Sequence, residues 1–191
     1  MSNGASGDTP TGAAQHLADQ ARAGLENAAP GHGDAAPLKL EQFLPYRLNV
    51  VASLVSQALS RIYAERYKIG VPEWRVLVTL GQFGVMTGKA VGAHSHMHKT
   101  KVSRAVAELE KRKLVTRRAN RADLRESFLS LTAAGRTIYE ELAPSALEFA
   151  RRLAEVVDPA DRVTFERAIQ RLTQRSRALA EKIARMKSEV S

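Results

Sequence analysis

Two long stretches of the chain carry apolar residues at intervals of three and four, which places those residues on one face of an α-helix. The first stripe, in a helix predicted over roughly 39–68, is Leu44, Leu48, Val51, Val55, Leu59 and Ile62. The second stripe, near the C-terminus, is Phe165, Ile169, Leu172, Ser176, Leu179, Ile183 and Met186. Stripes of this length suit a helix–helix seam, so we expect a mainly helical fold whose terminal helices form a homodimer.

Proline and glycine predict where several helices begin and end. Gly70 should end the first long helix, and Pro72 stands where a first helical turn tolerates proline. A short helix is therefore predicted over 73–80, interrupted at Gly81 and Gly84.

The middle of the chain predicts two helices and a hairpin. The helices are expected over 88–95 and 99–113, the second with an apolar face of Val102, Val106 and Leu109. Two segments with strand character, 114–119 and 127–131, enclose the polar loop 120–126.

Two further helices complete the predicted order. Thr132 should cap the first, and Pro144 in its middle should kink it. Its apolar face is Ile138, Leu142, Ala146, Phe149, Leu153 and Val156. Asp158 and Pro159 should open the last helix as its cap and first-turn proline.

Composition excludes several classes of protein. The chain has no cysteine, which removes disulfides, thiolate metal sites and thiol nucleophiles. No run approaches the roughly 18 apolar residues of a membrane span, and the N-terminus does not read as a secretory signal, so we expect a cytoplasmic protein without a membrane partner. No glycine-rich phosphate loop or nucleophile elbow is present, so we expect neither an enzyme nor a cofactor.

Charge separates the first 37 residues from the rest. Ala, Gly and Pro supply 19 of these 37 residues, and their net charge is −3, which predicts a disordered N-terminal tail. Since the whole chain carries +9, residues 38–191 carry +12. A balance this basic points to a polyanionic partner, nucleic acid first.

The positive charge is concentrated in one segment. Residues 99–125 hold ten basic residues against Glu108, Glu110 and Asp123, a net +7. The basic residues are Lys99, Lys101, Arg104, Lys111, Arg112, Lys113, Arg117, Arg118, Arg121 and Arg125. This concentration on one helix and the following hairpin predicts a surface that binds DNA phosphates.

The start of the 99–113 helix alternates basic and small hydroxyl residues. The candidate DNA contacts there are Lys99, Thr100, Lys101, Ser103 and Arg104. Hydroxyl groups can reach bases or phosphates, and arginine can form paired bonds to guanine, as the N-terminal residues of a recognition helix do in the major groove.

Several motifs in register resemble the MarR family of bacterial winged helix–turn–helix regulators. They are Trp74-Arg75-Val76-Leu77, then Lys99-Thr100-Lys101-Val102-Ser103-Arg104-Ala105-Val106, Leu109-Glu110-Lys111-Arg112-Lys113-Leu114-Val115, Arg117-Arg118, Asp123-Leu124-Arg125 and Leu131-Thr132-Ala133-Ala134-Gly135. The resemblance covers roughly 40–186 and is most specific over 99–135.

The resemblance implies a homodimer with two DNA-binding lobes on a pseudo-palindromic double-stranded operator. The implied winged helix–turn–helix domain is 71–132, and the implied dimerisation domain is made of 38–70 and 133–187. The recognition helix would be 98–112 and the wing tip 120–126. Asp123 would orient Arg125, which would enter the minor groove with Arg121, while Arg117 and Arg118 lie on the wing strand.

The chain departs from the family pattern at two places. Lys113 stands where members often have glycine, and 89–94 lacks the usual acidic-apolar-alanine character. The boundaries of the 87–97 segment are therefore the least constrained by the resemblance.

The resemblance also implies a small-molecule effector bound between the dimerisation helices and the DNA-binding lobe. The residues that could line its pocket are Tyr46, Arg47, Val50, Trp74, Arg75 and Phe83. Trp74 and Phe83 have an alternative role as core residues. The expected effector is an aromatic acid or its coenzyme A thioester. If it is the thioester, Arg151 and Arg152 could bind the coenzyme A phosphates; otherwise these arginines are ordinary surface residues.

Two alternatives stay open at this point. An architectural protein without an effector would use the same basic surface with little sequence preference. A metal-responsive repressor would use His94 and His98, which would share one face if both lay on a helix, although we expect no metal there.

Overall fold

The computed structural model describes residues 37–120 and 126–189. Residues 1–36 of the expected tail, and Arg121, Asp123 and Arg125 of the expected wing tip, lie outside the described residues. The chain divides into two units, Met1–Arg61 and Ile62–Ser191, and the boundary falls inside helix α2 (Leu44–Tyr67). Each unit is described by itself.

In the first unit, α2 begins at Leu44 and not near residue 39 as the stripe predicted. Pro45 is compatible with this start, because proline is tolerated in the first turn of a helix, where its missing N–H needs no partner. The preceding residues form a turn in which Gln42 N–H donates to the Lys39 carbonyl at 3.1 Å. Leu44, Leu48 and Val51 of the stripe are exposed.

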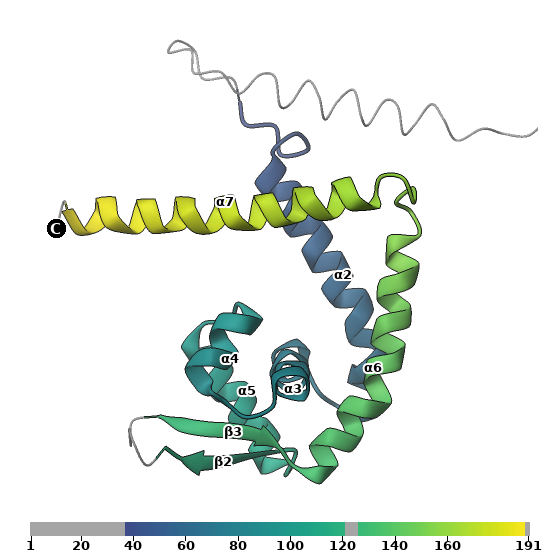
Figure 1. The fold of residues 1–191 in the computed structure, drawn as a ribbon, viewed down its shortest axis with the longest axis vertical. Coiled ribbons are helices and arrows are strands. Elements are labelled where there is room, and N and C mark those ends of the chain that lie inside the picture. Colours follow the sequence, from purple (N-terminus) through teal and green to yellow (C-terminus); the bar gives the residue numbers. More distant parts are fainter. Residues whose placement is uncertain (1–36, 121–125, 190–191) are drawn as a thin grey trace, which may run out of the picture. The chain divides into compact units, whose positions relative to one another are not determined.

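The second unit contains a lobe built from three helices and a small sheet (Figure 1). Its elements are α3 (Val71–Phe83), β1 (Met86–Thr87), α4 (Gly88–Ser95), α5 (Lys99–Lys111), β2 (Val115–Ala119) and β3 (Ser127–Leu131). The sheet is antiparallel with the order β1-β3-β2, and Leu129 of the central strand pairs with Met86 on one side and Arg117 on the other. This is a helix–turn–helix followed by a wing, as predicted.

Apolar side chains from every helix of the lobe form its core. Leu77 and Leu80 of α3, Val91 of α4, and Val106 and Leu109 of α5 are almost completely buried. The predicted inward face of α5 is therefore confirmed. The hairpin strand predicted over 127–131 and the helix predicted over 88–95 also have the expected bounds. Strand β1 was not predicted, because two residues are too few to show a period.

Gly81 does not interrupt α3, which contradicts the prediction of a break at this position. A Cβ built at Gly81 would lie 2.5 Å from Cδ2 of the Tyr139 ring. The glycine therefore makes room for an aromatic ring of the next long helix. The helix ends at Phe83, and the Gly84 N–H donates to the Leu80 carbonyl at 2.9 Å.

Helix α6 (Ala133–Ala154) follows the wing and continues through Pro144. Thr132 caps it as predicted, because its Oγ1 accepts the Gly135 N–H at 3.1 Å. The same hydroxyl donates to the Lys113 carbonyl at 2.7 Å, and a Cβ at Gly135 would lie 2.0 Å from the Leu114 carbonyl oxygen. The closing Leu-Thr-Ala-Ala-Gly motif thus fits the first turn of α6 closely against Lys113 and Leu114, which follow α5.

The last helix, α7 (Arg162–Glu189), begins three residues later than Asp158 and Pro159 predicted. Asp158 instead closes a separate turn, in which its Oδ1 accepts the Ala160 N–H at 2.8 Å and its carbonyl accepts the Asp161 N–H at 2.9 Å. No residue of α7 is buried, and the apolar members of its predicted stripe are 36–57% exposed. Within the described ranges, no helix is long and apolar enough to cross a membrane.

Candidate nucleic-acid interface

Helix α5 presents a polar N-terminal face beside its buried one. His98 is the N-cap, and its Nδ1 accepts the Thr100 N–H at 3.4 Å. The five residues predicted to contact DNA in this helix are all exposed: Lys99, Thr100, Lys101, Ser103 and Arg104. A helix N-terminus carries partial positive charge, which adds to the charge of the two lysines.

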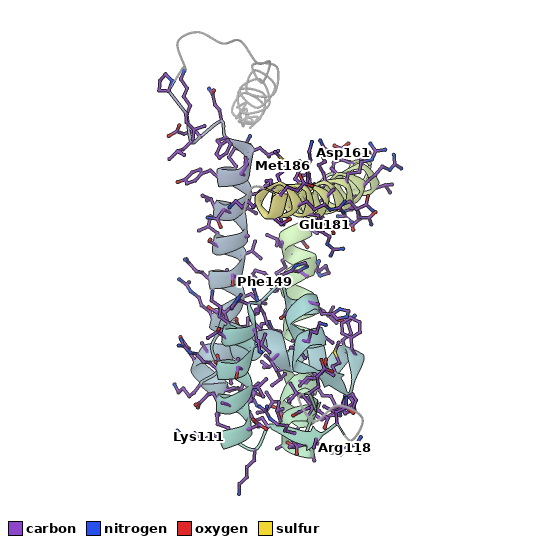
Figure 2. All side chains as sticks on the ribbon, turned by 90° about the vertical axis from the view of Figure 1, so that its left-hand side faces the viewer. Lys111, Arg118, Phe149, Asp161, Glu181 and Met186 are labelled. Atoms are coloured by element: carbon purple, nitrogen blue, oxygen red, sulfur yellow. The ribbon has the colours of Figure 1, made fainter. Side chains whose placement is uncertain are left out.

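The wing strand β2 presents its arginines in different ways. Its residues Thr116–Ala119 are exposed, whereas Val115 is buried. Arg118 projects from the hairpin, and Figure 2 shows it with Lys111 of α5 at the same end of the lobe. Arg117 is paired with Glu110 of α5, through Nε to Oε1 at 3.0 Å and Nη2 to Oε2 at 2.9 Å. This pair raises the pKa of Arg117 and holds the hairpin against α5.

A cavity of about 570 Å³ lies between α4, α5 and the hairpin. Polar groups of Lys89, Lys99 and Ser103 line it together with apolar atoms of Val102 and Leu129. Sequence patterns did not reveal this cavity, because four separate segments contribute to it. It belongs to the same face as the predicted DNA contacts.

The predicted effector residues do not come together in one described pocket. Tyr46, Arg47 and Val50 belong to the first unit, whereas Trp74, Arg75 and Phe83 belong to the second. Trp74 is buried and stacks on Tyr63, with ring centroids 4.9 Å apart, which fits the core role. Burial also raises the pKa of Tyr63.

Arg75 and Phe83 lie on another side of α3 from this stack. They line a small cavity of about 310 Å³ together with Thr79 and His94. Phe83 is 48% exposed, which rules out the core role considered for it, and its ring centroid lies 4.3 Å from that of His94. A small planar group could therefore reach an arginine and an aromatic edge here.

The histidines do not have the geometry that a metal site would need. His94 lies in α4, which ends at Ser95, and His98 caps α5. His96 between them has a left-handed backbone, with φ 51°. The two side chains therefore do not share a helix face, and the described part of the chain contains no group of three potential metal ligands.

Comparison with known proteins gives the same fold and adds a family. A family model described as MarR family matches residues 67–126, which run from the end of α2 through α3, α4 and α5 to the first wing strand β2 and stop before β3. The structure of a MarR family transcriptional regulator from Silicibacter pomeroyi DSS is 26% identical with a TM-score of 0.62, and the match covers 77% of this chain and 98% of that one. Residues 67–126 are thus similar to the MarR family, in sequence and in fold.

Two other solved structures resemble this chain at lower identity and support the fold alone. One is Bordetella bronchiseptica BpsR, whose DNA binding is regulated by 6-hydroxynicotinic acid, at 22% identity and TM-score 0.57, covering 66% of this chain and 98% of that chain. The other is NadR in complex with 4-hydroxyphenylacetate, at 21% identity and TM-score 0.57, covering 75% and 97%. No curated protein matches the sequence.

The match to the MarR family over 67–126 supports a DNA-binding transcriptional regulator. The exposed face of α5 and the arginines of the wing strand are the parts of the lobe with the chemistry to meet DNA.

Proposed function

We propose that this regulator is a cytoplasmic repressor that leaves a pseudo-palindromic operator when a small molecule binds. The single observation that supports it most is the exposed N-terminal face of α5, where Thr100, Ser103 and Arg104 stand among lysines on a rigid, well-packed helix. Such a face can read base edges in the major groove, whereas a purely phosphate-binding surface needs only positive charge.

In this proposal the DNA-binding residues divide into two groups. Lys99, Thr100, Lys101, Ser103 and Arg104 enter the major groove. Arg117, Arg118, Arg121 and Arg125 serve the wing, with Asp123 orienting Arg125. Arg117 contributes while paired with Glu110, so its main effect is on the placement of the wing.

The proposed active form is a homodimer joined through 38–70 and 133–187, with 71–132 as the DNA-binding lobe. The exposed apolar stripe of α7 supports it, because a helix with no buried residue needs a partner for Leu172 and Leu179. Half-sites should then lie about 34 Å apart, one turn of DNA.

The proposed effector is an aromatic acid or its coenzyme A thioester, as in regulators of aromatic-compound catabolism. Two regulators of the same fold are described with 6-hydroxynicotinic acid and 4-hydroxyphenylacetate, both aromatic acids. Arg75 and Phe83, which line one cavity, could hold the carboxylate and the ring, with Tyr46, Arg47, Val50 and Trp74 as the other candidates. Arg151 and Arg152 both bond Glu148 on the exposed side of α6, so a coenzyme A phosphate there would have to compete with this carboxylate.

The test is fluorescence anisotropy with DNA from upstream of the protein's own gene, titrated against scrambled DNA at fixed salt. We expect the upstream DNA to bind about a thousandfold more tightly, and an aromatic acid to release it. The acid must bind the released state better than the DNA-bound one. Equal, salt-sensitive binding to both DNAs, without release, would instead identify an architectural protein.

A further inference from the structure

Arg112, one of the basic residues in the 99–125 segment, points away from the candidate DNA face. Arg112 follows the last residue of α5 and donates from its guanidinium to two backbone carbonyls at the end of α2. Nη1 donates to the Lys68 carbonyl at 3.0 Å, and Nη2 donates to the Tyr67 carbonyl. Arg112 is half-buried, whereas its neighbours Lys111 and Lys113 are exposed.

The end of α2 offers these carbonyls for a physical reason. Helix α2 stops at Tyr67, and Lys68 takes a left-handed backbone with φ 51°. The last carbonyls of a helix have no partner within the helix and carry its partial negative charge. A planar guanidinium can satisfy two acceptors at once, which an ammonium group cannot do in the same geometry.

The same end of α2 is also held from other sides. The Tyr67 hydroxyl donates to Glu141 of α6, and Arg66 Nη2 donates to the same carboxylate oxygen at 2.9 Å. One turn earlier, Tyr63 stacks on Trp74 of α3. Arg112 therefore ties the C-terminal end of the recognition helix to a point that is anchored on α3 and α6.

We propose that Arg112 is a positioning residue that sets where α5 stands relative to the end of α2, and that it does not neutralise a DNA phosphate. This inference rests on the proposed function, in which α5 reads the operator. Base readout depends on hydrogen-bond geometry, whereas phosphate attraction tolerates small shifts of the helix. Loss of the Arg112 fork should thus reduce sequence discrimination more than general DNA affinity.

The experiment compares three full-length variants on operator and scrambled DNA over a salt series. Arg112→Met removes the charge and the fork, and Arg112→Lys keeps the charge but cannot make the fork. Lys111→Met is the matched control. It also removes one positive charge, but from an exposed side chain at the neighbouring position. We expect both Arg112 variants to lower the operator-to-scrambled affinity ratio about tenfold, the scale of a lost charged hydrogen bond. Lys111→Met should leave this ratio unchanged.

The salt dependence separates positioning from phosphate contact. Arg112→Lys should keep the wild-type slope of log affinity against log salt, while still losing discrimination. Two results would overturn the inference: a wild-type affinity ratio in Arg112→Lys, or an equal loss on both DNAs in Arg112→Met with a slope reduced by about one.

Folding is controlled by circular dichroism melting, with binding measured below each transition. If Arg112→Met does not fold, Arg112→Lys alone still decides between the two roles. If the wild-type protein shows no preference for the operator, the proposed function is refuted. If the wild-type protein is specific and the Arg112 variants keep that specificity, only the positioning role of Arg112 is refuted.

Discussion

Lys113 has a backbone conformation that glycine adopts more readily. Its φ is 56°, and it follows α5 at the position where the chain reverses. Its N–H donates to the Glu110 carbonyl at 2.9 Å and the Leu114 N–H to the Leu109 carbonyl at 2.9 Å, the two bonds of a Schellman motif. The departure from the family's frequent glycine is therefore a local strain and not a different turn.

Replacing this lysine should raise stability. Lys113→Gly removes the Cβ that the left-handed conformation disfavours, so we expect the free energy of unfolding to rise by about 0.5–1 kcal/mol. Urea unfolding measures this change in stability, provided that the variant keeps the m-value of the wild-type protein. Lys113→Ala is the control, because it keeps the Cβ and should change little. A glycine variant no more stable than the alanine variant would contradict this explanation.

Arg104 provides the residue-scale test of base readout. Its side chain is exposed on the N-terminal half of α5. In Arg104→Ala we expect a loss of about 1–3 kcal/mol in operator binding that depends on particular base pairs. Anisotropy with a set of single base-pair operator variants measures it. If every sequence loses the same affinity, Arg104 contacts phosphate.

Helices in this protein are shaped by what packs against them as well as by their own residues. Gly81 would be expected to weaken a helix, yet α3 runs through it to Phe83 because Tyr139 of α6 occupies the space of a side chain. Packing between the two helices thus overrides the local preference.

A methyl group at this position should be costly. In Gly81→Ala the added Cβ would lie within 2.7 Å of three ring atoms of Tyr139, so we expect a loss of about 1–3 kcal/mol despite the better helix propensity of alanine. Gly88→Ala is the matched control, since its Cβ would meet only Leu129 Cδ1 at 4.0 Å. Thermal unfolding measures the stability of the two variants relative to the wild-type protein. Equal stability of the two variants would show that Tyr139 moves aside freely.

The exposed face of α6 contains an ion-pair cluster with a defined pH response. Hydrogen bonds from Arg151 and Arg152 lower the pKa of Glu148 from 4.5 to about 2. Since the folded pKa is lowered, the pair's contribution is fully present above pH 4.5 and is lost as the pH falls through about 2. NMR titration of the Glu148 carboxyl carbon should show this midpoint. Replacing both arginines with glutamine should return it to the ordinary range, and an unchanged midpoint would contradict the assignment.

At the scale of the whole molecule, the apolar surface of α7 is the feature that most requires a second chain. Phe165, Ile169, Leu172, Leu179 and Ile183 follow one face and are all at least 36% exposed. Exposed apolar area of this kind marks an interaction surface.

Charges on that face should separate the proposed dimer. In Leu172→Glu with Leu179→Glu, two carboxylates would have to be buried in the interface, so we expect monomers by light scattering. Gln174→Glu with Ala178→Glu is the control, because these residues lie on another face of the same exposed helix and should leave a dimer. A dimeric Leu172/Leu179 variant would place the interface elsewhere.

The sequence by itself determined the order of the elements other than the two-residue strand β1, and it determined where the charge is concentrated. Hydrophobic periodicity and capping act over three or four residues. The sequence therefore predicted α4, the wing strands, the Thr132 cap and the exposed face of α5. The family motifs then connected these elements to DNA. The error at Asp158 also has a local cause, an aspartate turn.

Only the tertiary structure decided which basic residues face outward. Arg112 meets backbone carbonyls 44 and 45 residues away, and Arg117 is held by Glu110. It also decided that Gly81 faces a ring and that Arg75 and Phe83 share a cavity with His94. These partners come from separate elements, and no periodicity along the chain records how helices approach one another. The sequence states which chemical groups each side chain carries. Packing between elements decides which of these groups are paired inside the fold and which remain exposed.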